Sequence, residues 1–159
     1  DAAITYIEDI DKKKYENQEL YNENLSLMFG NNLLSEKINS ITWKEASKLP
    51  LCLLSKFMKE RENMDKAFEE SNSIPSPKLE CNSIFQLAFH VMSQNIATIV
   101  PSGFSTKNNA FPNTREIPLI EPVVRKPVGL VWKKAEPPFP MAKALSILLN
   151  QNLEKFDEI

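Results

Sequence analysis

The sequence predicts an α/β protein, because short apolar runs of strand length alternate with segments whose apolar residues recur at helical spacing. Residues 49–54 (LPLCLL) form a fully apolar run that ends at Ser55, which is typical of a strand buried on both faces of a sheet. Met64, Ala67 and Phe68 recur at the spacing of one helix face, so an amphipathic helix is expected over residues 58–71.

The remaining elements follow from the same two patterns and from residues that mark boundaries. Thr42 followed by Glu45 forms a capping box that starts a short helix, and Ser83 caps a helix that reaches Ser93. Strands are expected at residues 2–7, 20–29, 49–54, 78–81, 96–100, 117–122 and 128–133, and polar loops at 8–17 and 105–114. A last amphipathic helix is expected after the proline-rich residues 137–140, carrying Met141, Ala144, Leu145, Leu148 and Phe156.

The composition is that of an ordinary globular domain and excludes several classes of function. Of the 159 residues, 42% are hydrophobic and 25% are charged, and 19 basic against 21 acidic side chains give a net charge of −2. This balance lacks the basic surplus that holds nucleic acid, so the chain itself is not expected to bind DNA. The chain shows neither an apolar run of membrane-spanning length nor a signal peptide, which predicts a cytoplasmic location with no membrane partner.

The sequence shows no catalytic, metal-binding or cofactor-binding pattern. His90 is the single histidine, the chain has no GxSxG motif, and its three glycines form no phosphate-binding loop. Cys52 and Cys81 lie in or beside apolar strands without metal-ligand spacing, so both are expected to be reduced thiols of the core. We therefore expect neither an enzyme nor a metal or cofactor.

Polar residues follow three of the expected strands at the point where each strand ends. In open α/β sheets, ligands collect at the carboxyl ends of strands, where loop amides and helix N-termini offer donors to an anion. The alternative is that the same residues only cap helices or line loops, that Lys56 and Arg61 are ordinary exposed charges, which we favour for Arg61, and that Phe104 packs in the core. The candidate ligand-binding residues are Ser55, Lys56, Asn82, Ser83, Pro101, Ser102, Gly103 and Phe104.

The expected helix over residues 83–93 is apolar on two faces. Ile84, Leu87, Ala88 and Val91 form one face, and Phe85, Phe89 and Met92 form the other. A helix that is apolar on nearly all sides must be covered on nearly all sides. A partner subunit is the expected cover of the second face, which predicts a homodimer or tetramer.

The order of these segments resembles the effector-binding (substrate-binding) domain of LysR-type transcriptional regulators. The opening DAAITY is similar to the LD-x-AI strand of that family, and residues 20–29 (LYNENLSLMF) to its PL-x-x-E-x-L-x-L-V strand. Residues 64–104 resemble the family's second lobe, and residues 121–149 its closing strand and helix. Asn95 stands where the family commonly has glycine, and asparagine also tolerates a left-handed backbone.

The resemblance implies the two-lobed α/β fold of type 2 periplasmic binding proteins. Residues 1–54 would then be part of lobe I, residues 55–104 lobe II, and residues 105–159 the return to lobe I with a C-terminal strand and helix. The family's first strands and helices have no counterpart before Asp1, so the fold is expected to be N-terminally truncated.

The resemblance also implies a function. A small anionic metabolite would bind in the cleft between the lobes, through Ser55, Asn82, Ser83 and the turn at 101–104, and would alter DNA binding by the N-terminal domain of the parent regulator. Two alternatives stay open at this point. The first is a periplasmic solute-binding protein of the same fold, which would need a signal peptide. The second is an interaction module that responds to no small molecule.

Overall fold

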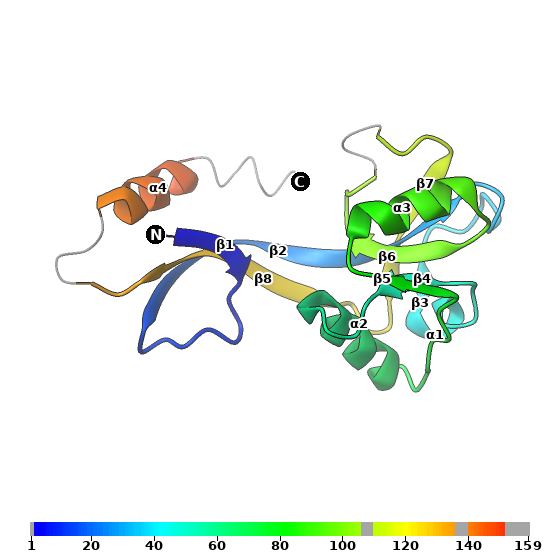
Figure 1. Cartoon of the computed structure of the whole chain (residues 1–159), viewed down its shortest axis with the longest axis horizontal. Helices are drawn as coiled ribbons and strands as arrows, with labels where there is room; N and C mark the ends of the chain where they lie inside the picture. The colour runs from blue at the N-terminus through cyan, green and yellow to red at the C-terminus, as the bar shows by residue number, and fades with distance from the viewer. Residues whose placement is uncertain (1, 106–109, 136–139, 152–159) are drawn as a thin grey trace. The chain divides into compact units, whose positions relative to one another are not determined.

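The computed structural model describes residues 2–105, 110–135 and 140–151 of an α/β protein, as Figure 1 shows. Its elements in chain order are β1 (Ala2–Tyr6), β2 (Tyr15–Gly30), β3 (Ile41–Thr42), α1 (Trp43–Ala46), β4 (Cys52–Leu54), α2 (Lys59–Glu70), β5 (Leu79–Cys81), α3 (Ile84–Ser93), β6 (Ala97–Pro101), β7 (Thr114–Ile120), β8 (Arg125–Lys133) and α4 (Pro140–Asn150). The chain divides into two compact units, and each is described by itself. The first unit comprises Asp1–Glu23 with Arg125–Ile159, and the second comprises Asn24–Val124.

The first unit is built on the pairing of β1 with β8. These strands run antiparallel from the pair Ala2 and Trp132 to the pair Tyr6 and Val128, and the first part of β2 lies beside β8 in the same sheet. Glycine is required at Gly129, because a Cβ there would lie 2.5 Å from the carbonyl oxygen of Gln18. The close approach of β2 to β8 therefore depends on the missing side chain.

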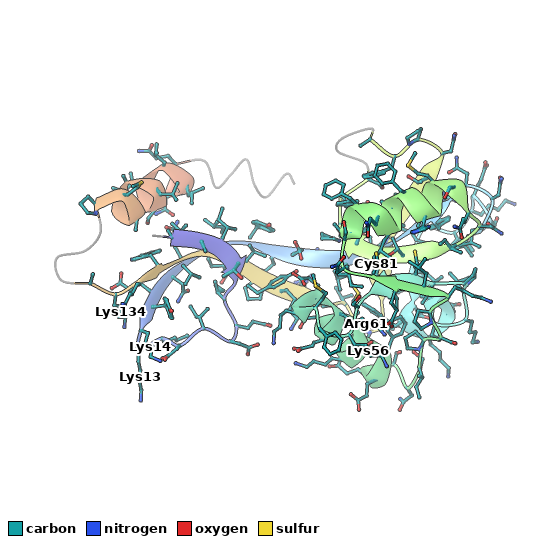
Figure 2. The ribbon with its side chains drawn as sticks, viewed as in Figure 1. Lys13, Lys14, Lys56, Arg61, Cys81 and Lys134 are labelled. Atoms are coloured by element: carbon teal, nitrogen blue, oxygen red, sulfur yellow. The ribbon has the colours of Figure 1, made fainter. Side chains whose placement is uncertain are left out.

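Polar contacts link β2 and the loop before it with the end of β8 and with α4. The Lys134 amide donates to the Lys14 carbonyl at 2.9 Å, and Lys134 Nζ donates to the Lys12 carbonyl at 2.8 Å. Figure 2 labels Lys13, Lys14 and Lys134 at this place in the unit. Helix α4 contacts β2 through Ser146, whose hydroxyl donates to the Gln18 carboxamide at 2.5 Å.

The second unit contains a sheet in which the last part of β2 is central. Strands β6 and β7 flank it, both antiparallel, and β3 pairs with β7 in parallel through Ile41 and Leu119. Strands β4 and β5 form a parallel pair, and a parallel bridge between Leu51 and Ala97 joins β4 to β6. Strands β5, β4 and β6 therefore point in the same direction, with α3 on one side of them and α1 and α2 on the other.

The core of the second unit surrounds β4, as the apolar run at 49–54 predicts. Leu51, Cys52 and Leu53 are fully buried. Trp43 packs edge-on against Phe68 with their ring centroids 5.0 Å apart, which joins α1 to α2. Other buried members of this core are Leu27, Met28, Phe29, Met64, Leu87, Val91, Ile99 and Val100.

The helix boundaries follow their capping residues. Thr42 and Glu45 form the predicted capping box: the Glu45 amide donates to Thr42 Oγ1 at 3.1 Å, and the Thr42 amide donates to a Glu45 carboxylate oxygen at 3.0 Å. The Thr42 hydroxyl also donates to this carboxylate oxygen, at 2.8 Å, and the bonds from the Thr42 amide and hydroxyl lower the pKa of Glu45. Helix α2 ends at Glu70 with Ser71 as its C-cap, and the next residue, Asn72, adopts a positive φ of 51° before the proline-containing segment.

Two features of the fold differ from the expected elements. Strand β2 begins at Tyr15, within the stretch expected to be a loop, because its polar first part pairs with β8 through backbone groups that need no apolar side chains. Strand β3 has two residues, too few for a period to be recognised, and was not expected. Phe156 and the residues at 137–139 lie outside the described residues.

The two compact units do not coincide with the expected lobes. In the chain, the boundaries of the units fall between residues 23 and 24 and between 124 and 125, whereas those of the expected lobes fall between 54 and 55 and between 104 and 105. The lobe boundaries stay a prediction. No described helix is long and apolar enough to cross a membrane.

Both cysteines are free thiols, as expected. Cys52 is fully buried in β4, and this burial raises the pKa of its thiol to about 11. Cys81 is only half-buried.

We predict that Cys52 in the native chain resists alkylation at pH 8. With a pKa of about 11, the reactive thiolate is only about one part in a thousand at that pH, and the core excludes the reagent. Iodoacetamide labelling followed by peptide mass spectrometry should show Cys52 reacting at least about 100-fold more slowly in the native chain than in guanidinium. Cys81 is the internal reference, and equal native rates at the two cysteines would contradict the burial of Cys52.

Candidate functional site

The candidate site is the carboxyl edge of the parallel strands β5, β4 and β6. Leu54 and Cys81 are paired at the ends of β4 and β5, and the Ser55 amide donates to the Cys81 carbonyl at 2.8 Å. Because β6 runs in the same direction, the turn that begins at Pro101 leaves the same edge. The fold thus places the predicted residues after all three strands at one edge of the second unit.

Ser55 begins a short turn that leads into α2. The Met58 amide donates to the Ser55 carbonyl at 2.9 Å, which closes the turn around Lys56 and Phe57. Both of these side chains are exposed, and that of Phe57 is 99% exposed. Lys56 and Arg61 line a hollow of about 350 Å³ together with other residues of α2 and with residues 73–75, and Figure 2 shows Lys56 and Arg61 at α2.

Ser83 begins α3 as its N-cap. Its hydroxyl accepts a hydrogen bond from the Gln86 amide at 3.5 Å, a long bond, and its carbonyl accepts from the Leu87 amide at 3.1 Å. The capping role considered for Ser83 is therefore present, and the same geometry leaves the positive end of the helix dipole at the carboxyl edge. Asn82 lies between β5 and this N-cap and is exposed.

The turn after β6 binds a carboxylate of the chain itself. Gly103 adopts a left-handed φ of 86°, and its amide donates to Glu116 of β7 at 2.5 Å. The Ser105 amide and hydroxyl donate to the other carboxylate oxygen at 3.0 and 2.9 Å. Ser102 forms a hydroxyl–hydroxyl bond of 2.7 Å with Ser26. Sequence reasoning missed Glu116 and Ser26, because single polar residues inside strand-like runs carry no signal of such contacts.

Phe104 packs against other aromatic rings. Its ring stacks on Phe111 with centroids 5.2 Å apart and meets Phe85 of α3 edge-on at 5.4 Å. Phe89 of the same helix meets Phe111 at 6.0 Å. We call Phe85, Phe89, Phe104 and Phe111 the aromatic cluster. Of its members, Phe85 and Phe89 are more than half exposed, at 58% and 59%.

Arg61 corrects one expectation, because it is not an ordinary exposed charge. Its side chain is only 3% exposed; Nε donates to Asp65 at 2.8 Å, and Nη1 donates to Glu80 of β5 at 2.7 Å. Nη1 also donates to the Leu54 carbonyl at 2.6 Å. Burial by itself would lower the pKa of the guanidinium, but its bonds to Asp65 and Glu80 raise that pKa, so Arg61 stays charged. Its charge is compensated inside the unit rather than offered to a ligand.

The described residues contain no group of histidine, cysteine and acidic side chains arranged to hold a metal ion. His90 lies on α3, where its Nδ1 is 3.3 Å from the Gln94 carboxamide nitrogen. A second hollow, of about 560 Å³, lies at the C-terminal end of α3, where Gln94, Asn95 and Asn113 line it. It lies at the other end of the helix from the candidate site.

Comparison with known protein families identifies the chain. The model of the LysR substrate binding domain matches residues 1–154. The chain belongs to this family, whose domains have the two-lobed fold of periplasmic binding proteins, and the predicted resemblance and α/β fold class are confirmed. No curated protein sequence matches the chain.

Solved structures of the same kind share this fold. The effector binding domain of QuiR in complex with shikimate is 20% identical, with a TM-score of 0.79, over 98% of this chain and 72% of that chain. The regulatory domain of CcmR from Synechocystis PCC6803 in complex with 2-PG is 11% identical, with a TM-score of 0.78, over 94% and 71%. CbnR, a LysR family transcriptional regulator, is 13% identical, with a TM-score of 0.76, over 96% of this chain and 52% of its own. This chain therefore spans about half the length of CbnR.

We predict that replacing Arg61 with alanine destabilises the second unit. The change removes hydrogen bonds to two carboxylates and to the Leu54 carbonyl, so the free energy of unfolding should fall by about 2–3 kcal/mol. Urea unfolding followed by circular dichroism measures this difference. Arg125→Ala, which truncates an exposed arginine of β8, is the matched control and should stay within about 0.5 kcal/mol of the parent chain. Equal effects of the two changes would show that the buried contacts of Arg61 contribute nothing.

Proposed function

We propose that the chain is the effector-sensing domain of a LysR-type bacterial transcriptional regulator and not an enzyme. It binds a small anionic metabolite at the carboxyl edge of β5, β4 and β6, and the parent protein converts this binding into altered DNA binding through a separate N-terminal domain. Family membership over residues 1–154 supports the sensing role. Shikimate and 2-PG, bound in two of the similar structures, are both small molecules, which supports an effector of that size.

The observation that carries the anionic assignment is that Lys56 and the N-terminus of α3 follow the ends of two paired strands, β4 and β5. Lys56 is exposed directly after β4, and Ser83 caps α3 directly after β5. A helix N-terminus favours negative charge, and the Lys56 ammonium group adds a positive charge after the neighbouring strand. Ser55 and Asn82 directly follow the paired residues Leu54 and Cys81 and supply hydrogen-bonding side chains.

For binding of the metabolite to alter DNA binding, the parent protein must have two arrangements. The metabolite must bind one of them more tightly than the other. The effector then shifts the population toward that arrangement, and the shift cannot exceed the difference between the two affinities. A regulator of this kind acts in the cytoplasm, where its DNA lies.

The exposed face of α3 is the proposed contact with a second copy of the chain. Phe85, Phe89 and Met92 lie on that face, while Leu87, Ala88 and Val91 of the opposite face are buried in the core. Exposed aromatic rings gathered on one helix are typical of a protein interface. The proposed assembly is a homodimer, or a tetramer built from it.

We predict that Lys56→Met weakens binding of the effector by about 5- to 10-fold, since one partly solvated charge pair contributes about 1 kcal/mol. A thermal-unfolding screen of small carboxylates, with shikimate among them and uncharged analogues beside them, should first identify a compound that stabilises the chain. Titration of that compound then compares Lys56→Met with Lys66→Met, which removes an exposed lysine of α2. Stabilisation by the uncharged analogues alone, or equal loss in both variants, would contradict the assignment.

In the full-length parent, Ser55→Tyr should abolish effector-dependent transcription, because a bulky ring fills the strand end while the core beneath it is unchanged. A reporter gene under the parent's own promoter measures the response. Native circular dichroism of the variant chain shows that the fold is retained. An unaltered response in the variant would remove Ser55 from the site.

We predict that Phe89→Glu disrupts self-association, because it places a charge in the centre of the proposed interface. Sedimentation velocity should show the variant as a monomer at concentrations where the parent chain is a dimer or larger. Ile74→Glu is the matched control, since Ile74 is 92% exposed and lies outside α3. An oligomer unaffected by Phe89→Glu would exclude α3 from the contact.

A further inference from the structure

The turn that follows β6 holds the carboxylate of Glu116 with three donors. The Gly103 amide donates to Oε1 at 2.5 Å, and the Ser105 amide and hydroxyl donate to Oε2 at 3.0 and 2.9 Å. Both carboxylate oxygens are therefore bound. Hydrogen bonds that end on an ionised oxygen are about twice as strong as neutral ones.

The other backbone amides of this turn also have partners inside the second unit. The Ser102 amide donates to the Asn24 carbonyl at 2.9 Å, and the Phe104 amide donates to the Pro101 carbonyl at 3.1 Å. The Ser102 hydroxyl is bonded to that of Ser26, which is buried. Every amide from Ser102 to Ser105 is thus engaged by the chain, and those of Gly103 and Ser105 are engaged by one side chain.

The backbone of the turn explains why it binds a carboxylate. The positive φ of Gly103 turns the chain so that amides on both sides of Phe104 reach the same carboxylate. Backbone concavities of this kind, in which nearby N–H groups converge, bind anions. Glu116 occupies this concavity from β7, the strand that pairs with β2 through Met28.

We propose that residues 101–105 form a carboxylate-binding site that Glu116 fills in cis, and that Glu116 determines specificity by excluding anionic groups from this end of the candidate site. The specificity role rests on the proposed function; the occupied carboxylate site does not. An anionic group of the effector is then directed toward Lys56 and the N-terminus of α3. The part of the effector that lies beside the turn carries a neutral group, such as a hydroxyl, because a second carboxylate there would meet both the charge of Glu116 and donors already used.

The test is to empty the site and refill it with a free carboxylate. Glu116→Ala removes the internal ligand, and its melting temperature should fall by about 5 °C, because charge-assisted hydrogen bonds to three donors are lost. Acetate should restore that temperature in a saturable way in Glu116→Ala. Acetamide, which has the same shape without the charge, should not restore it, and sodium chloride holds the ionic strength equal in all samples.

The parent chain and two variants serve as controls in the same titration. Acetate should stabilise the parent chain and Glu116→Gln no more than acetamide does, because a side chain still fills the turn in both. Glu70→Ala, which truncates an exposed glutamate at the end of α2, should behave like the parent chain. Acetate-specific stabilisation of every variant, or of none, would overturn the proposal.

A second measurement keeps the proposal testable if Glu116→Ala does not fold. Glu116→Gln retains an acceptor but loses the charge, so hydrogen exchange at the Gly103 and Ser105 amides should accelerate by about tenfold, whereas the Phe104 amide, bonded to Pro101, should change less. Unchanged exchange at Gly103 and Ser105 would overturn the proposal. Neither measurement uses the effector, so a failure here is distinguishable from a failure of Lys56→Met to alter effector binding.

Discussion

The burial of the strand at residues 51–54 on both of its faces is the constraint on which the second unit depends. A strand that is apolar on both faces must have a paired strand on each edge and a helix over each face. Strands β5 and β6 supply the edges, and α2 and α3 both contact β4. The chain passes from β4 to β5 through α2 and from β5 to β6 through α3, and each connection returns it in the same direction. The three strands therefore end at the same edge of the sheet. The packing of an apolar core therefore gathers the polar ends at one place, without any requirement from ligand chemistry.

Near that edge, the charges of Arg61 and Glu116 have partners within the chain, whereas that of Lys56 is exposed. Arg61 is bound to the end of β4 and to Glu80 of β5, and Glu116 is bound to the turn after β6. A buried or half-buried charge without such partners would destabilise the fold, so the charges of Arg61 and Glu116 are both compensated within the chain. Lys56 is exposed at the same edge. The proposed preference for an anionic effector follows from this separation of roles.

Helix α3 connects the core, the candidate site and the proposed interface. Its N-cap Ser83 lies at the carboxyl edge, its face with Leu87 and Val91 is buried, and its other face carries Phe85 and Phe89 of the aromatic cluster. Phe85 also contacts Phe104 of the turn after β6. A ligand that displaces this turn would therefore move rings that belong to the proposed contact between subunits. This physical route is consistent with a sensor whose bound state favours one assembly over another.

The sequence alone determined the α/β class, the core strand at 49–54, the capping box at Thr42 and the helix begun by Ser83, because hydrophobic period and capping chemistry are local properties. It also placed the candidate residues at strand ends, although their binding role stays a prediction. It did not determine the burial of Arg61, the capture of Glu116 by the turn at Gly103, or the pairing of β2 from Tyr15 onward. Each of these three features involves residues that are distant in the chain. Only the folded backbone decides which hydrogen-bond donors and acceptors meet. The energy of such a contact depends on three-dimensional distance and burial rather than on local sequence pattern.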